Sequence, residues 1–201
     1  MSRVIKLYIW ELGANAPSSG EAALICVKRY SQEYCLTDVS ALLSDPAKTV
    51  IIRDARGKPR FADIPQLCFS VSHSGAYGVC AVHYDNVGLD LQAHKNCDKR
   101  AIARRFFHPD EYDYLEKEDF LSFFEVWTAK ESYLKYTGEG LSRGLGSFSV
   151  IDASGLAVGI ESGNGTAALR HCNPFPGYSM CVCVASCTFT EQSLPIGYSR
   201  I

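Results

Sequence analysis

The sequence has no excess of charge of either sign and no hydrophobic run of membrane-spanning length. Lysine and arginine together number 20, aspartate and glutamate 22, and the formal net charge is −2. This balance removes the general electrostatic argument for a nucleic-acid-binding protein. No apolar stretch approaches the ~18 residues that a membrane helix needs, and residues 1–7 become polar again too soon for a signal-peptide core. We therefore expect a cytoplasmic protein that binds neither nucleic acid nor membrane.

Low-complexity segments and paired C-x-x-C motifs are also absent. The 201 residues are 47% apolar and 21% charged, which is typical of a globular protein with one large domain or two small ones. In a reducing compartment, most of the nine cysteines are interpreted as small buried hydrophobic residues. Cys181, Cys183 and Cys187 would supply three thiolates to a zinc ion, but the first two lie in an apolar run that predicts a strand. We favour the core interpretation.

Local patterns in the first part of the chain predict a strand, a helix and a hairpin. Residues 4–10 alternate as a strand does, and Ser18 with Glu21 forms a capping box in front of a helix. Residues 67–72 and 77–82 are two runs of period two joined by a His-Ser-Gly corner, which is typical of a β-hairpin.

A polar pair projects from the next predicted strand, residues 87–92. The odd-numbered residues of this strand are apolar and share one face, whereas Asp90 and Gln92 share the other. Two polar side chains on the same face of a strand are candidates for a site.

The rest of the chain is predicted to consist of helices followed by strands. Pro109 suits the first turn of a short helix, and a long helix is predicted from about Asp119 to Tyr136, closed by Gly138. Strands are predicted at 148–151, 156–161, 166–171 and 179–187. The order favours an α+β fold with two related halves, a subdomain of residues 1–87 and a subdomain of residues 88–201.

The apolar stripe of the long helix contains one carboxylate. Glu131 continues the helical spacing of the aromatic residues Phe124 and Trp127, and a carboxylate on a packed face needs a partner. Lys135, four residues later, would form a common surface ion pair worth a few tenths of a kcal/mol. Asp90 would instead complete a site for a hard cation such as Mg²⁺, which takes oxygen ligands from one or two carboxylates and from substrate phosphates.

Basic and hydroxyl side chains accompany these carboxylates. Lys58 follows a glycine in a turn, Lys130 and Lys135 lie beside the helical carboxylate, and Ser72 and His73 offer hydrogen-bond donors. Each of them alone is more commonly a turn or surface residue. Together they suit a phosphate-binding site.

Five motifs occur in an order and spacing that resemble one known family. They are Gly57-Lys58-Pro59, residues 69–74 (Phe-Ser-Val-Ser-His-Ser), residues 87–90 (Val-Gly-Leu-Asp), residues 105–112 (Arg-Phe-Phe-His-Pro-Asp-Glu-Tyr) and residues 127–135 (Trp-Thr-Ala-Lys-Glu-Ser-Tyr-Leu-Lys). In these motifs the chain resembles the 4′-phosphopantetheinyl transferases of the surfactin-synthetase-activating type. The resemblance covers residues 57 to about 150, and it leaves basic residues of the first part, such as Arg53, without a counterpart. It implies two similar subdomains related by a pseudo-twofold axis, in a monomer.

The resemblance also implies a reaction. The phosphopantetheine arm of coenzyme A would be transferred to a serine of an apo acyl or peptidyl carrier protein, releasing adenosine 3′,5′-bisphosphate, so the chain would be a holo-[acyl-carrier-protein] synthase. By this resemblance Asp90, Glu131 and Gln92 would hold Mg²⁺, and Glu131 would assist removal of the serine proton. Lys135 would bind the pyrophosphate.

The nucleotide end of coenzyme A is assigned by the same resemblance to Lys58, Ser72 and His73, with Lys130 as a further contributor. One departure is Gln92, which stands where many relatives have a second acidic residue. The site is then one negative charge poorer, which motivates an alternative: a non-catalytic module that binds coenzyme A or a carrier protein. Magnesium-dependent turnover separates the two hypotheses.

Overall fold

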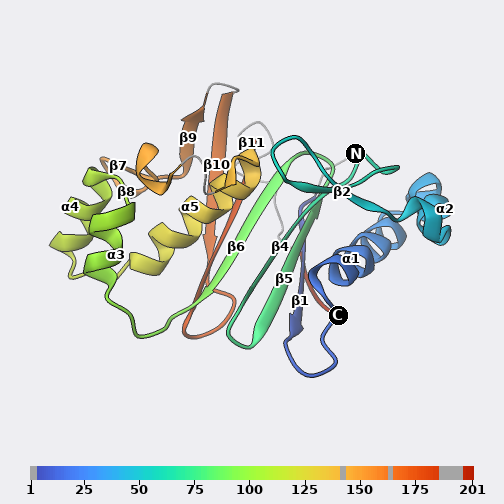
Figure 1. Cartoon of the computed structure of the whole chain (residues 1–201), viewed down its shortest axis with the longest axis horizontal. Helices are drawn as coiled ribbons and strands as arrows, with labels where there is room; N and C mark the ends of the chain where they lie inside the picture. Colours follow the sequence, from blue (N-terminus) through green and yellow to red (C-terminus); the bar gives the residue numbers. More distant parts are fainter. Residues whose placement is uncertain (1–3, 141–143, 163–164, 186–196) are drawn as a thin grey trace.

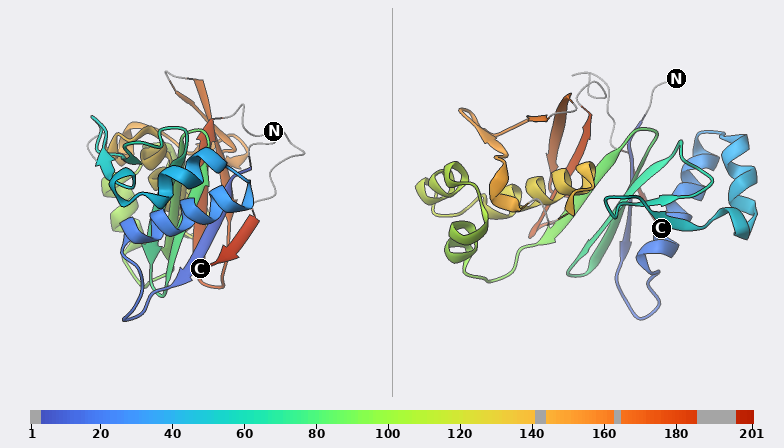
Figure 2. Two further views of the ribbon diagram at one scale, coloured as in Figure 1. Left: turned by 90° about the vertical axis from the view of Figure 1, so that its right-hand side faces the viewer. Right: turned by 45° about the horizontal axis from the view of Figure 1, so that its top comes forward.

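The computed structural model describes residues 4–140, 144–162, 165–185 and 197–201. Two four-stranded sheets pack against each other in the middle, and helices cover the outer face of each sheet (Figures 1 and 2). Helices and mostly antiparallel strands occur together, so the predicted α+β class is confirmed.

The first sheet has the strand order β12-β1-β5-β4. Its strands are β1 (Lys6–Glu11), β4 (Cys68–Ser74), β5 (Tyr77–His83) and β12 (Gly197–Arg200). β4 and β5 form the predicted hairpin, whereas β12 pairs in parallel with β1. Because β12 comes from the end of the described chain, the first sheet is not built from residues 1–87 alone.

Helix α1 (Ser19–Glu33) covers the outer face of the first sheet, and α2 (Thr37–Ser44) packs against α1. The predicted capping box begins α1: Ser18 Oγ accepts from the Glu21 amide, and Glu21 Oε2 accepts from the Ser18 amide at 2.9 Å. After the 3-10 turn η1 (Pro46–Lys48), the short strands β2 (Ile51–Arg53) and β3 (Pro59–Phe61) form a hairpin that carries the Gly-Lys turn.

The second sheet has the strand order β6-β11-β10-β9 and is antiparallel throughout. Its strands are β6 (Val87–Ala93), β9 (Gly159–Ser162), β10 (Gly165–Cys172) and β11 (Tyr178–Ala185). Its outer layer contains α3 (Lys99–Phe106), α4 (Pro109–Lys117) and α5 (Phe123–Thr137), together with η3 (Leu145–Ser147) and the small pair β7 (Ile151–Asp152) and β8 (Gly155–Leu156). Pro109 begins α4 as predicted.

The long helix begins later than its apolar spacing predicts. α5 starts at Phe123 and not near Asp119, because Asp119 and Phe120 adopt left-handed backbone angles, with φ of 51° and 58°. Two consecutive left-handed residues end a right-handed helical path. At the other end Gly138 closes the helix with φ of 75°, as predicted.

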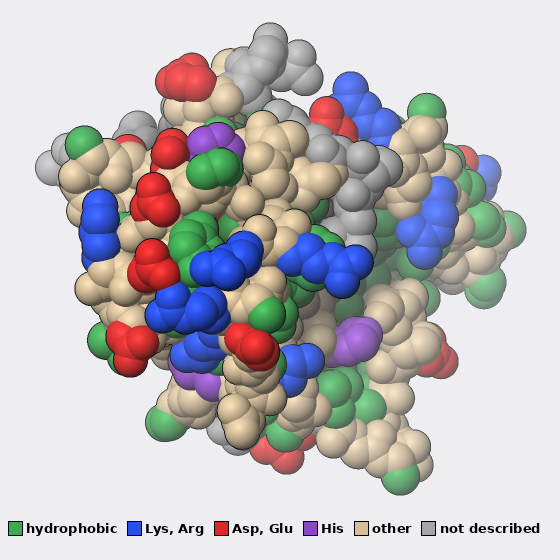
Figure 3. All heavy atoms as spheres, turned by 60° about the vertical axis from the view of Figure 1, so that its left-hand side comes forward, with side chains coloured by type: hydrophobic (Ala, Val, Ile, Leu, Met, Phe, Trp, Pro, Cys, Tyr) green, Lys and Arg blue, Asp and Glu red, His purple; other side chains and the backbone are tan. Residues whose placement is uncertain are grey.

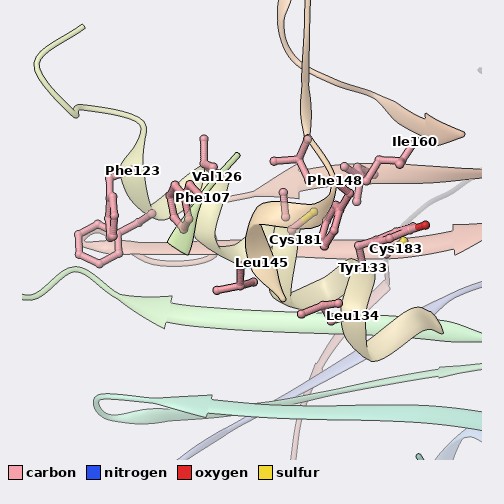
Figure 4. Packing of buried hydrophobic residues seen from close by; sticks show 14 of the residues in the cluster. Phe107, Phe123, Val126, Tyr133, Leu134, Leu145, Phe148, Ile160, Cys181 and Cys183 are labelled. Carbon is pink, nitrogen blue, oxygen red and sulfur yellow. The ribbon is translucent and has the colours of Figure 1, made fainter. Parts of the chain in front are cut away.

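Helix α5 packs closely on the second sheet. Figure 4 shows aromatic and aliphatic side chains gathered around it, among them Phe107, Phe148 and Ile160. Gly88 on β6 allows this approach, because a Cβ at that position would lie 2.0 Å from the carbonyl oxygen of Ser132 on α5. The glycine of the Val-Gly-Leu-Asp motif therefore brings α5 against the strand that carries Asp90.

A third core lies between the two sheets. Apolar residues of β1 and β5 meet the apolar face of β6 and β11; those that are buried are Ile5, Leu7, Ile9, Val79, Ala81, Val87, Leu89, Leu91, Met180, Val182 and Val184. The predicted alternation on β6 is confirmed, because its apolar residues face this core and Asp90 faces α5.

Serine hydroxyls join the two sheets where the edge strands β4 and β6 lie side by side (Figure 1). Ser70 Oγ accepts from the amide of Leu89 at 3.0 Å, and Ser72 Oγ accepts from the amide of Leu91 at 3.1 Å. Ser74 Oγ accepts from the Ala93 amide at 3.0 Å. Three alternate residues of one strand thus pair with three alternate amides of the other, and we call this row the serine seam.

The cysteines of the described chain are free thiols, and several are core residues. Cys181 and Cys183 are fully buried on β11, as predicted, and burial raises the pKa of Cys181 to about 12. A buried, protonated thiol packs as a small hydrophobic residue, as the core interpretation requires. Cys187 lies outside the described residues.

In the part of the chain that the structure describes, no helix is both long enough and apolar enough to cross a membrane.

Candidate active site

A pocket of about 640 Å³ lies where the serine seam, α5 and the β2–β3 hairpin meet. All the predicted site residues except Lys130 line it: Lys58, Ser72, His73, Asp90, Gln92, Glu131 and Lys135. These residues are spread from position 58 to position 135 of the sequence and come from both halves of the chain. The pocket therefore depends on the packing of the two sheets.

Asp90 and Glu131 place two interacting carboxylates in the lining of the pocket. Asp90 is only 6% exposed, and its Oδ1 atom accepts hydrogen bonds from Ser72 Oγ at 2.9 Å and Lys135 Nζ at 2.7 Å. Burial raises the pKa of Glu131, and the negative charge of Asp90 raises it further, whereas Lys135 lowers it. A second negative charge at this position is unfavourable unless a cation or a proton joins it.

Lys135 forms its ion pair across the pocket. Its ammonium contacts Asp90 on β6, and this contact replaces the surface pair with Glu131 that the helical spacing alone allows. The lysine is about one-third exposed and has three donors, so two hydrogens remain for a ligand in the pocket.

Gln92 has an amide whose orientation is determined by its neighbours. Its Nε2 atom donates to Ser74 Oγ at 3.0 Å and to the Ala93 carbonyl at 3.1 Å. A carbonyl oxygen only accepts, so the amide nitrogen must be the atom that faces it. The amide oxygen Oε1 is then the atom of Gln92 that suits a cation.

Lys58 lies at the junction of three segments. Its Nζ atom donates to Asn86 Oδ1, to the Val87 carbonyl at 2.8 Å and to the Tyr136 carbonyl at 3.2 Å. Burial lowers the pKa of this ammonium to about 8. The lysine therefore connects the β2–β3 hairpin to the start of β6 and to the last turn of α5, although it also lines the pocket.

The structure does not bring Lys130 into the pocket with the other predicted site residues. Lys130 is fully buried on the opposite side of α5, where its ammonium contacts Glu111 Oε1 at 2.6 Å and the Phe148 carbonyl at 2.7 Å. It also lies over the ring of Phe148, 4.2 Å from the centroid. Adjacent residues on a helix point about 100° apart, so Lys130 enters the core while its neighbour Glu131 reaches the pocket.

Two arginines and the start of α1 complete the lining. Arg53 and Arg56 belong to the β2–β3 hairpin, and Ser19 and Gly20 are the first residues of α1. No sequence pattern marked Arg56 as a site residue, because charged turn residues are common on protein surfaces. The start of α1 was predicted as a helix end but not as part of a site. Together with His73, the arginines add basic side chains to a lining that also contains the two carboxylates.

A second group of basic side chains lies outside the pocket, on α3. Figure 3 shows Lys and Arg side chains interspersed with carboxylates on the face formed by α3 and α4. Arg100 pairs with Glu116 of α4, and Arg104 donates to the hydroxyl of Tyr112 at 2.9 Å. These contacts link α3 to α4.

Comparison with known proteins agrees with the motif pattern. A family model described as the 4′-phosphopantetheinyl transferase superfamily matches residues 86–183. The chain is 33% identical over 153 residues to 4′-phosphopantetheinyl transferase Sfp of Bacillus subtilis (strain 168), a match that covers 72% of this chain and 67% of that protein.

Two further relatives carry the same enzyme name. Identity is 36% over 146 residues to 4′-phosphopantetheinyl transferase psf-1 of Bacillus pumilus, covering 69% of this chain and 62% of that protein. It is 38% over 109 residues to 4′-phosphopantetheinyl transferase HetI of a Nostoc species, covering 49% and 46%. The matched segment of the family model contains the strand and the helix that supply Asp90, Glu131 and Lys135.

Proposed function

Since this chain belongs to the 4′-phosphopantetheinyl transferase superfamily, we infer that it transfers the 4′-phosphopantetheine moiety of coenzyme A to a serine of an apo carrier protein. The chain is thus a transferase of the holo-[acyl-carrier-protein] synthase kind, and adenosine 3′,5′-bisphosphate is the other product. The observation that supports this function most directly is the pocket in which Asp90, Glu131 and Lys135 converge.

We propose that coenzyme A lies along the pocket with its pyrophosphate near Lys135 and its nucleotide end toward other basic side chains of the lining. These are Arg53, Arg56 and His73, and cationic or donor side chains suit the phosphate groups of the nucleotide. The pyrophosphate would then lie beside Asp90 and Glu131, whose negative charges call for a cation.

The donor set around these carboxylates fits Mg²⁺. In the described chain no group of three or more His, Cys, Asp or Glu side chains is gathered for a metal ion. Mg²⁺ is commonly bound by one or two carboxylates plus substrate phosphates and water, so two carboxylates suffice. Asp90, Glu131 and Gln92 Oε1 would hold the ion. When bound, it would neutralise charge on the pyrophosphate.

The residues of this chain then have separate tasks in the transfer. The serine oxygen of the carrier bonds to the phosphorus that bears the pantetheine arm, and the bond from that phosphorus to the nucleotide's bridging oxygen breaks. Glu131 would accept the serine proton, a task that suits a carboxylate whose pKa is raised by burial. Lys135 would donate to the pyrophosphate as charge builds up on the leaving group.

Intact-protein mass spectrometry tests the function. The protein is incubated with coenzyme A, Mg²⁺ and a panel of apo carrier proteins, with a parallel set that contains a chelator. We expect a chelator-sensitive mass gain of one phosphopantetheine on at least one carrier. Binding of coenzyme A without mass gain on any carrier would contradict the transferase function and support a non-catalytic binding module.

Gln92→Glu is expected to change the metal requirement. The substitution adds a carboxylate to the proposed cation site, so the Mg²⁺ concentration for half-maximal transfer should fall several-fold. A titration of the transfer rate with Mg²⁺ measures this effect, and Gln32→Glu, the same change at an exposed position of α1, is the charge control. An unchanged titration would place Gln92 outside the coordination sphere.

Lys58→Met is expected to destabilise the junction. The variant keeps the side-chain length but removes the donor shared by Asn86, Val87 and Tyr136, which should cost about 1–3 kcal/mol of unfolding free energy. Urea unfolding measures the loss, and Lys28→Met on the exposed side of α1 should stay within about 0.5 kcal/mol of the parent. Weaker coenzyme A binding at unchanged stability would instead make Lys58 a direct nucleotide ligand.

We also propose that the chain consists of two related halves, residues 1–87 and 88–201, that act as a monomer in the cytoplasm. Residues 1–87 contribute three strands of the first sheet and residues 88–201 most of the second, and each sheet has a 15-residue helix, α1 or α5, on its outer face, which supports a pseudo-twofold relation. One strand crosses this division: β12 belongs to residues 88–201 but pairs with β1 in the first sheet.

A further inference from the structure

One hydroxyl of the serine seam has a contact that the other two lack. Ser70, Ser72 and Ser74 each accept an amide hydrogen from β6, but only Ser72 also contacts a carboxylate, at 2.9 Å from Asp90 Oδ1. Ser72 is 6% exposed. Because a carboxylate accepts and a hydroxyl has one hydrogen, that hydrogen belongs to the Ser72–Asp90 contact.

The contact with Asp90 leaves Ser72 little capacity for a phosphate. Its hydrogen is directed to Asp90 and one of its lone pairs takes the Leu91 amide hydrogen, whereas a phosphate oxygen would need a donor. The assignment of Ser72 to the nucleotide end of coenzyme A, which the family resemblance implies, does not account for these two bonds.

The same contact has a clear effect on Asp90. Ser72 and Lys135 both donate to Oδ1, one from the first half of the chain and one from the second. Two donors on one oxygen hold the carboxylate plane, and Oδ2 keeps its lone pairs for another ligand. The Leu91 amide in turn holds Ser72, so the orientation of Asp90 is linked to the backbone of its own strand.

We propose that Ser72 is a positioning residue for Asp90: it links the serine seam to the carboxylate and leaves Oδ2 available to a divalent cation. This inference rests on the proposed function. It assigns to one seam serine a task that its neighbour Ser70, bonded in the same way to Leu89, does not have.

Ser72→Ala with Ser70→Ala as the matched control tests the proposal. Each variant loses one seam bond, and Ser72→Ala also loses the bond to Asp90, so both should lower the unfolding temperature and Ser72→Ala should lower it more. Loss of a group that orients a metal ligand typically costs about 10–100-fold in activity or metal affinity. We therefore expect Ser72→Ala alone to reduce kcat and raise the Mg²⁺ requirement on that scale, with the Kd for coenzyme A in chelator unchanged.

Three further measurements make the outcome decisive. Ser72→Thr keeps the hydroxyl and should restore most of kcat, and Ser72→Cys, a weak donor of similar volume, replaces the alanine variant if that variant does not fold. Mn²⁺ binding with coenzyme A present, followed by the electron paramagnetic resonance signal of the free ion, should weaken in the Ser72 variant only. This readout requires no turnover, so it decides the role of Ser72 even if transfer to every carrier fails.

Two results would overturn the proposal. If Ser72→Ala raises the Kd for coenzyme A and leaves kcat and Mn²⁺ binding unchanged, Ser72 is a nucleotide ligand. If Ser72→Ala and Ser70→Ala alter kcat, Mn²⁺ binding and stability equally, the seam is structural and has no specific link to Asp90.

Discussion

Replacing Glu131 with Gln is expected to abolish phosphopantetheine transfer, by at least about 10³-fold, while the protein stays folded. The substitution keeps the side-chain shape but removes a proton acceptor and the negative charge offered to the cation, and general base catalysis alone contributes about 10²–10⁴-fold. Transfer is measured by the mass gain of a carrier protein under single-turnover conditions. The Kd for coenzyme A in chelator is expected to change little, because the affected groups act on the pyrophosphate and the serine.

The same variant should be at least as stable as the parent. Burial and the charge of Asp90 raise the pKa of Glu131, so the folded state disfavours the charged form of this side chain, and Gln has no such charge. An unchanged or increased free energy of unfolding is what we expect on replacing a group that is retained for activity at some cost in stability. Glu125→Gln, on the same helix outside the pocket lining, is the control and should transfer normally. A folded Glu131→Gln variant with near-normal transfer would contradict the role of Glu131.

Replacing Lys130 with Met destabilises the second half strongly. Lys130 and Glu111 form an ion pair with both side chains fully buried, and Glu111 also accepts from the amides of Val150 and His108. Removal of one partner leaves an uncompensated buried charge, which typically costs about 3–5 kcal/mol. Urea unfolding should show a loss of this size, whereas Lys117→Met at the exposed end of α4 should stay within about 0.5 kcal/mol.

A double variant distinguishes a structural role of the Lys130–Glu111 ion pair from a role in coenzyme A binding. Glu111→Gln combined with Lys130→Met removes both charges, so part of the lost stability should return, and the double-mutant cycle gives the coupling energy. The folded fraction of each variant should bind coenzyme A normally. If Lys130→Met keeps its stability but loses affinity for coenzyme A, the ammonium serves the ligand and the buried pair is not its main task.

Local patterns were sufficient where a structure depends on neighbours in the sequence. The capping box at Ser18, the proline that begins α4 and the glycine that closes α5 were predicted correctly, because caps and turns are satisfied within a few residues. Alternation along β6 likewise separated Asp90 from the core-facing residues. The start of α5 was predicted too early, because helical spacing carries no sign of the left-handed residues Asp119 and Phe120.

The partners of the charged side chains required the tertiary structure. Lys130 and Glu131 are neighbours in one motif, yet one is neutralised in the core by Glu111 and the other faces Asp90 in a pocket. Lys58 and Ser72 lie in motifs that indicate a ligand site, but their hydrogen bonds run to protein groups at the junction of the halves.

The chain's own residues therefore determined the fold class, the family and the place of the site, because these depend on periodicity and on motifs read along the backbone. Only the packing of the two sheets and α5 decided that Lys130 lies in the core, Lys58 at the junction of the halves and Lys135 in the pocket. The energy of a charged group depends on its burial and on partners that can lie tens of residues away in the sequence, and the adjacent residues predict neither.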